Sequence, residues 1–248
     1  MTPELLPLAV AGVAFVIIAI LVAIVACSRG EAARLRRALS TAAVDLERLQ
    51  LSFSRFAPQA VVESIIARGV TTTADRKEVT ILFADLVGFT PLSERLDPNV
   101  LVDVLNGYFT RMTRVVADHR GHVSKFIGDG ILALFGALER NPWQANDAVQ
   151  AALAMQDALA AYNGELQDRG LPALRVGIGV HAGNVVAGVI GSSELMEFTV
   201  VGSPVNLAAR VEELTRVYDA GILVTDAVRH GLGPNVRLRE LPPTPVAG

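Results

Sequence analysis

Two aspartates, Asp85 and Asp129, are the residues of this sequence best placed to do chemistry. Asp85 ends the apolar run VTILFA, and Asp129 follows the run KFI across a single glycine. Because short apolar runs are typical of buried strands, each carboxylate is expected at the end of a strand. Two carboxylates at adjacent strand ends are the minimum site for two Mg²⁺ ions that also bind substrate phosphates. The alternative for Asp85 alone is that it starts a turn or caps the next helix.

Further polar side chains occur at spacings that suit a nucleotide. Asn206 and Arg210 are four residues apart in a predicted helix, so they share one helix face. An amide and a guanidinium there address a sugar and a phosphate together, since arginine is a strong donor to phosphate oxygens. The alternative is an ordinary surface helix in which Arg210 lies near Glu213. Lys125 lies four residues before Asp129 in an apolar hairpin, although a lone lysine is more often a solvated strand residue.

The elements that must position these residues alternate between strand and helix patterns. Asp97 is a predicted N-cap, with Pro98 at the first helical position. The turn at Gly128-Asp129-Gly130 predicts a hairpin. Strands mixed with helices in this way predict an α+β sandwich, with helices packed on a mostly antiparallel sheet. Strands are expected at 79–84, 122–127, 131–135, 174–180, 185–190, 197–201, 222–225 and 236–239, and helices after Asp97, at 145–167, at 204–215 and as a turn at 226–230.

Residues 8–27 form an uncharged apolar stretch of 20 residues. About 20 helical residues cross the core of a bilayer, so a transmembrane helix is expected there. Basic residues remain on the cytoplasmic side, so residues 1–7 are expected outside and the bulk of the chain in the cytoplasm, anchored to the inner or plasma membrane by a single pass. The run also loosely fits a lipoprotein cleavage site before Cys27. The basic residues, which also suit lipid headgroups, are Arg29, Arg34, Arg36 and Arg37.

Residues 28–57 are expected to form a parallel coiled coil that ties two copies of the chain together. Apolar residues recur there from Leu35 to Phe56 at alternating spacings of 4 and 3, with no glycine or proline before Pro58. The alternative is one amphipathic helix that lies on its own domain. Residues 58–77 are expected to form a short helix and a linker, and residues 78–248 the main domain.

The composition argues against several classes of site. The net charge of −3 gives no basic surface for nucleic acid. The single cysteine, Cys27, allows neither an intrachain disulfide nor a cysteine-based zinc site. The glycines between 177 and 202 lack the strand-turn-helix spacing of a dinucleotide fingerprint.

Four blocks of the sequence, in order, resemble the four blocks of class III nucleotidyl cyclases. The blocks are VTILFADLVGFT, KFIGDGILALFG, RVGIGVHAGNVVAGVIGS and FTVVGSPVNLAARVEELT, and together they cover about residues 79–225. The resemblance implies the catalytic fold of that family, a ferredoxin-like or palm-type sheet with packed helices. It also implies two Mg²⁺ or Mn²⁺ ions per site and a head-to-tail homodimer whose sites lie at the interface.

The resemblance implies a metal and phosphate site around the first two blocks. Asp85 and Asp129 match the two metal-binding aspartates, with the backbone carbonyl of Leu86 as a further ligand. The turn from Leu86 to Thr90 matches the segment that cradles the phosphates. Its residues assigned to the substrate are Gly88, Phe89 and Thr90.

The same resemblance implies which residues bind the rest of the nucleotide. Lys125 matches the lysine that reads the purine ring, and Thr199 matches its partner. Asn206 matches the asparagine that orients the ribose, and Arg210 the arginine that stabilises charge at the α-phosphate. Arg175 matches a phosphate-contacting arginine.

The sequence therefore predicts an adenylyl cyclase that makes cyclic AMP and pyrophosphate from ATP. Lys125 and Thr199 favour ATP, because a guanine-specific site would need an acceptor such as Glu in place of Lys125. The alternatives are a guanylyl cyclase and a non-catalytic membrane module that only dimerises or binds nucleotide. One feature departs from the family, whose C-terminal lysine meets the terminal phosphate: the only lysines of this chain are Lys77 and Lys125.

Overall fold

The computed structural model describes residues 39–46, 74–192 and 196–246. The chain divides into two compact units, Met1–Phe56 and Ala57–Gly248. In the first unit, residues 39–46 are helical and all of them are exposed. The remainder of the predicted coil, the predicted membrane span 8–27 and the short helix predicted after Pro58 lie outside the described residues. Among the residues that are described, no helix is long and apolar enough to span a bilayer.

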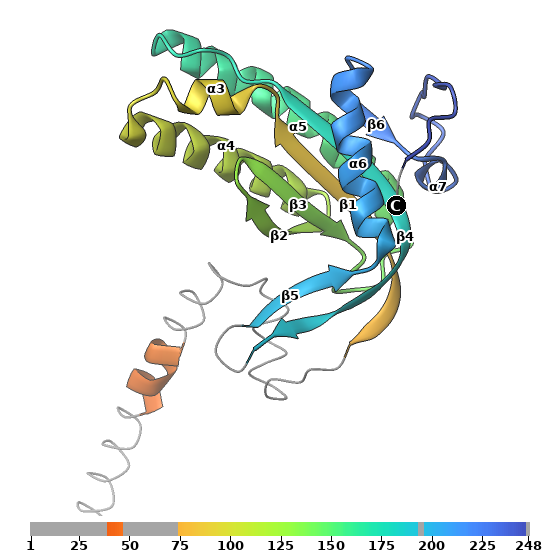
Figure 1. Cartoon of the computed structure of the whole chain (residues 1–248). Helices are drawn as coiled ribbons and strands as arrows, with labels where there is room; N and C mark the ends of the chain where they lie inside the picture. The colour runs from red at the N-terminus through yellow and green to blue at the C-terminus, as the bar shows by residue number, and fades with distance from the viewer. Residues whose placement is uncertain (1–38, 47–73, 193–195, 247–248) are drawn as a thin grey trace, which may run out of the picture. The chain divides into compact units, whose positions relative to one another are not determined.

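The second unit is built on a six-stranded sheet, shown in Figure 1. The strand order is β2-β3-β1-β4-β5, all antiparallel, and β6 pairs with β4 in parallel. The mostly antiparallel α+β sheet predicted from the sequence is confirmed. In chain order the elements are β1 (Asp75–Leu86), α3 (Phe89–Ser93), α4 (Pro98–Asp118), β2 (Gly121–Ile127), β3 (Gly130–Phe135), α5 (Gln144–Asp168), β4 (Val176–Gly191), β5 (Met196–Val201), α6 (Ser203–Val217), β6 (Ile222–Val224) and α7 (Asp226–Arg229).

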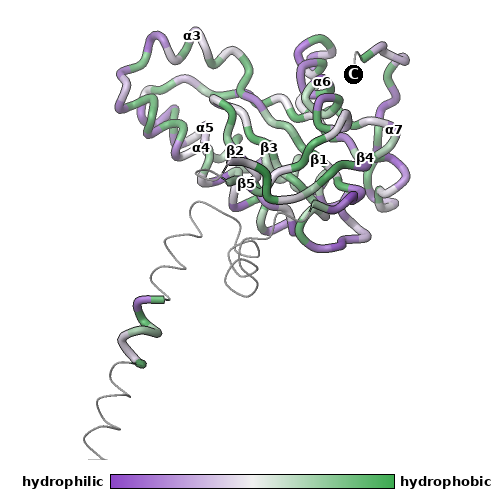
Figure 2. The backbone as a smooth tube through the Cα atoms, turned by 60° about the horizontal axis from the view of Figure 1, so that its bottom comes forward, coloured by the Kyte–Doolittle hydropathy of each residue, from purple (hydrophilic) through white to green (hydrophobic). Residues whose placement is uncertain are grey.

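Helices cover both faces of this sheet. Side chains along a strand alternate between its faces, so one strand contributes to two separate cores. In β1, Leu82 and Ala84 belong to a core that also contains the buried side chains of α4, α5 and α7. Val79 and Ile81 face the other way, into a smaller core that includes Ala208 of α6. Hydrophobic residues colour β3 and the middle of β1 green in Figure 2. The centre of the sheet is therefore buried on both sides.

Local signals at the helix and hairpin termini act as predicted. The Asp97 carboxylate accepts a hydrogen bond of 2.9 Å from the backbone N–H of Asn99, and Pro98 opens α4. The β2–β3 hairpin turns through Gly128, whose φ of 63° is left-handed and favours glycine. The left-handed conformation of Gly128 places Asp129 at the tip of a tight turn.

Three boundaries predicted from the sequence are wrong. β1 begins at Asp75, so residues 75–77 belong to the strand and not to the linker. The two strands predicted at 174–180 and 185–190 are one 16-residue strand, β4, because the segment between them pairs with β1, as in Gly183 opposite Val79. No strand forms at 236–239, where the chain lies outside the sheet without regular structure.

Candidate active site

Asp85 and Asp129 meet at one end of the sheet. The register of β1 with β3 pairs Ala84 with Ile131, so the next residue of β1, Asp85, lies beside the hairpin tip. A Cβ atom placed on Gly130 would be only 3.0 Å from Asp85 Oδ1. Burial raises the pKa of Asp85, and the negative charge of Asp129 raises it further. The structure thus brings together the two carboxylates that the sequence predicts at adjacent strand ends.

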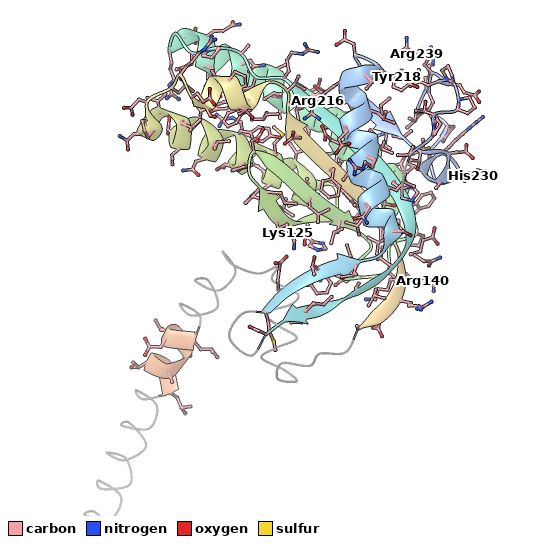
Figure 3. The ribbon with its side chains drawn as sticks, viewed as in Figure 1. Lys125, Arg140, Arg216, Tyr218, His230 and Arg239 are labelled. Carbon is pink, nitrogen blue, oxygen red and sulfur yellow. The ribbon has the colours of Figure 1, made fainter. Side chains whose placement is uncertain are left out.

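Arg216 of α6 pairs directly with this acidic site. Its Nη2 atom lies 2.5 Å from Asp85 Oδ2, and Figure 3 shows Arg216 on the side of α6 that faces the end of β1. The guanidinium and the N–H of Leu86 both lower the pKa of Asp85, against the larger effect of burial. Sequence reasoning missed Arg216, because nothing local relates it to a carboxylate 131 residues away.

Glu212 lies one helical turn before Arg216 and was also missed. Its Oε1 atom is 3.4 Å from Arg216 Nη2, and its side chain is only 8% exposed. That oxygen accepts no hydrogen bond among the described residues. Burial raises the pKa of Glu212 from 4.5 to about 7, and the nearby charges of Asp85 and Glu213 raise it while Arg216 lowers it. The i, i+4 spacing of Glu212 and Arg216 is the one sequence signal that could have found the pair.

Tyr108 of α4 is a buried polar residue close to the same acids. The residue has no exposed surface, and its hydroxyl has no hydrogen-bond partner within the described ranges. Burial raises the pKa of Tyr108, as do the charges of Asp85, Asp129 and Glu212. Tyr108 therefore remains protonated, with a donor available in the acidic region.

The first two N–H groups after Asp85 face other parts of the protein. The N–H of Val87 donates to the carbonyl of Arg175 at 2.8 Å, and the N–H of Leu86 lies where it lowers the pKa of Asp85. Gly88, with a φ of 71°, is the N-cap of the short helix α3. Phe89 packs its ring into the core while Thr90 is exposed, so these two residues can offer only backbone N–H and hydroxyl groups outward.

Lys125 projects from β2 toward β5, as Figure 3 shows, and forms an ion pair with Glu197. The adjacent Ser124 hydroxyl donates to the carbonyl of Phe198 at 3.3 Å. β2 and β5 are the two edges of the strand order, so the sheet curls until its edges approach each other. Thr199 lies on β5 two residues after Glu197, which brings it to the region of Lys125, although Glu197 is the residue that the lysine contacts.

The side chains of the remaining predicted residues pair with other groups or are exposed within one protomer. Asn206 and Arg210 are both exposed on α6. Arg210 pairs with Glu213 at 2.9 Å, the surface pairing that the sequence left open as an alternative. Arg175 precedes β4, is largely exposed and pairs with Asp219 at 2.9 Å. Among the described side chains, neither Arg210 nor Arg175 forms an ion pair with Asp85.

A comparison with known protein families identifies the family of this domain. Residues 72–248 match the adenylate and guanylate cyclase catalytic domain. The chain belongs to this family. The match includes the whole of the β-sheet, and it places the acidic pair, Lys125 and α6 inside one cyclase domain.

Individual relatives of this cyclase domain include enzymes named for either nucleotide. An adenylate cyclase of Anabaena cylindrica is 36% identical over 189 residues, which cover 73% of this chain and 37% of that protein. The crystal structure of the guanylyl cyclase Cya2 is 39% identical, with a TM-score of 0.64, covering 71% of this chain and 89% of that one. The adenylyl cyclase CyaB from P. aeruginosa is 30% identical, with a TM-score of 0.61, covering 64% and 82%. The chain thus spans little more than a third of the length of the Anabaena relative.

Proposed function

We propose that this chain is an adenylyl cyclase that converts ATP to 3′,5′-cyclic AMP and pyrophosphate. The observation that carries the proposal is the meeting of Asp85 and Asp129 at one end of the sheet. In the reaction, the ribose 3′-oxygen loses its proton and attacks the α-phosphorus in line, and the bond to pyrophosphate breaks. Membership of the family supports this chemistry.

The acidic pair fits divalent cations. Burial and Asp129 raise the pKa of Asp85, so a cation beside the two carboxylates relieves a repulsion that the fold already contains. Asp85, Asp129 and the carbonyl of Leu86 are oxygen donors, the kind that Mg²⁺ and Mn²⁺ take. Two such ions, when bound, would activate the 3′-hydroxyl and neutralise charge on the leaving pyrophosphate.

The chain's own residues would orient the nucleotide around that centre. The N–H groups of Gly88, Phe89 and Thr90 would bind the phosphates, since the N–H of Val87 already donates to Arg175. Asn206 would bind the ribose, and Arg210 would stabilise charge at the α-phosphate, where a guanidinium aimed at the migrating group acts most strongly.

We propose further that each site is shared by two protomers in a head-to-tail homodimer. Within one protomer, Arg210 pairs with Glu213 and not with the acidic pair, so it is available to a partner. Exposed apolar side chains near the edges of the curled sheet, which a partner could cover, support an interface there. They are Phe126, Ile127, Ile190, Met196 and Val201.

ATP is the proposed substrate because of Lys125 and Thr199. A lysine ammonium donates to ring nitrogens of adenine, whereas the N1–H and amino group of guanine need an acceptor. Glu197 offers such an acceptor beside Lys125, and Cya2 is a guanylyl cyclase, so GTP is the second candidate.

The N-terminal segment is proposed to anchor the enzyme to the inner or plasma membrane. The apolar stretch 8–27 and the four arginines after it support a single pass with the cyclase domain in the cytoplasm. The heptad pattern of 28–57, with Leu39 and Leu46 exposed on the helix at 39–46, supports a parallel coiled coil. Such a coil would raise the effective concentration of the two catalytic domains.

The first test is cyclic nucleotide production by the purified full chain in detergent, with Mn²⁺ and either ATP or GTP. Cyclic AMP, with a specific activity that rises with protein concentration, is expected. Cyclic GMP alone would overturn the substrate assignment. If neither ATP nor GTP gives a cyclic product, the non-catalytic module is favoured.

Complementation tests the shared site directly. The Asp85→Ala chain and the Arg210→Ala chain should each be inactive alone, because every site in either homodimer lacks one essential group. Mixed together they should regain activity, since a heterodimer contains one intact site. Dimers that form and remain inactive would contradict the shared arrangement.

A further inference from the structure

Asp85 already binds a cation in the free domain, and that cation is Arg216. The 2.5 Å contact joins Arg216 Nη2 to Asp85 Oδ2, and both side chains are about one-third exposed, at 38% and 33%. A divalent ion bound about 2.1 Å from that oxygen would lie less than about 5 Å from a second positive charge. Binding of a metal to Asp85 therefore requires Arg216 to move or to share its partner.

The fold holds a second acceptor for this guanidinium. Glu212 Oε1 lies 3.4 Å from the same Nη2 atom, just beyond a normal hydrogen bond. The Glu212 side chain is 8% exposed, and Oε1 has no hydrogen-bond partner among the described residues. A buried carboxylate oxygen without a donor is costly, so a small shift of Arg216 toward Glu212 fills an existing deficit.

Arg216 also has room to move. It lines a cavity of about 340 Å³ between α5, the start of β4 and the end of α6. Asp219, which pairs with Arg175, lies in the same wall. This cavity leaves the Arg216 side chain with open space on one side.

We infer that Arg216 is a positioning residue that takes the place of a metal ion at Asp85 and transfers to Glu212 when a divalent cation binds. The inference rests on the proposed metal-binding role of Asp85. Arg216 and the metal compete for one carboxylate, so the Arg216–Asp85 contact sets the metal affinity of the free enzyme. Glu212 acts on that affinity only through Arg216, as the receiver of its charge.

The test is Mn²⁺ binding to the full chain without nucleotide, followed by electron paramagnetic resonance of the free ion. Arg216→Met keeps an unbranched side chain and removes the charge, and it should tighten Mn²⁺ binding by about ten- to a hundred-fold, the worth of one hydrogen bond to a charged group. Arg216→Gln should tighten it less. The matched control is Arg169→Met, which removes the exposed Arg169–Asp103 ion pair of 2.7 Å and should leave binding unchanged.

A double-mutant cycle tests whether Glu212 acts on metal binding through Arg216 or attracts the metal directly. Glu212→Gln alone should weaken Mn²⁺ binding, because the neutral amide accepts Arg216 less strongly than a carboxylate does. In the Arg216→Met background the same substitution should have no effect. Weakening in both backgrounds would overturn the transfer.

The outcomes also distinguish this inference from the proposed function. Asp85→Asn should abolish Mn²⁺ binding in every background. Mn²⁺ binding that does not depend on Asp85 would defeat the metal assignment itself. Binding that depends on Asp85 and is unchanged or weakened by both Arg216 variants, with circular dichroism showing a folded chain, would defeat only the role of Arg216.

Discussion

Glu212 gives the cyclase domain a pH-dependent stability that one substitution should remove. The pKa of Glu212 rises from 4.5 to about 7 on folding, mainly because the side chain is buried. Between these values the folded protein keeps a proton that the unfolded chain has lost, so stability falls as the pH rises from about 4.5 to about 7. One pKa unit corresponds to about 1.4 kcal/mol, so the loss reaches an upper limit of about 3 kcal/mol above pH 7.

Glu212→Gln cannot ionise and should lack this loss. Below pH 4.5 the variant and the parent should be equally stable, and at pH 8 the variant should be more stable by about 1 to 3 kcal/mol, since it also gives up the attraction of Arg216. Urea denaturation of the full chain from pH 4.5 to 8, followed by circular dichroism and by the fluorescence of Trp143, the single tryptophan, measures the difference.

The matched control is Glu213→Gln, on the neighbouring exposed position of α6. Glu213 pairs with Arg210 at the surface, where an ion pair contributes little to stability, so its removal should leave the pH dependence of the parent intact. If the parent and Glu212→Gln lose stability in parallel between pH 4.5 and 7, the burial argument for Glu212 is refuted.

Four further variants test the fold and the site. Asp85→Ala should abolish cyclase activity while circular dichroism stays unchanged, and a folded, active variant would remove Asp85 from the site. Lys125→Glu combined with Thr199→Ser should shift nucleotide preference toward GTP, measured as the ratio of cyclic GMP to cyclic AMP. Gly179→Ala should destabilise the domain by about 3 kcal/mol, because its Cβ would lie 2.2 Å from the backbone nitrogen of Glu212. Gly164→Ala, inside α5 with open space around the new methyl group, should instead stabilise it by up to about 1 kcal/mol in the same denaturation assay.

Local chemistry made much of the fold predictable. The aspartate cap and the proline fixed the start of α4, and the glycines on either side of Asp129 fixed the hairpin, since each signal acts within a few residues. The gap predicted inside β4 was wrong because pairing with β1 carries the backbone through Gly183, against its weak strand preference. The alternation of Val236 and Leu238 with arginines did not produce a strand at 236–239, since a strand also needs backbone hydrogen bonds to a neighbouring strand, which this segment does not make.

Some residues of the candidate site could also be predicted from the local sequence, and others could not. Asp85, Asp129 and Lys125 are each marked by the short segment around them, and the resemblance to the family covers those segments. The partners of these residues come from elsewhere in the chain, Arg216 from α6 and Glu197 from β5. Such pairs depend on how the sheet curls and on where α6 crosses it. The sequence around either partner does not reveal this long-range geometry.

The hydrogen-bonded pairing of β1 with β4 affects how the domain folds during synthesis. Leu86 pairs with Val176, so the centre of the sheet joins segments about ninety residues apart. During synthesis β1 leaves the ribosome long before its partner, and only the β2–β3 hairpin is available to cover one of its edges. Contacts this distant along the chain slow folding. The nascent domain therefore exposes the strand that carries Asp85 until β4 has been translated.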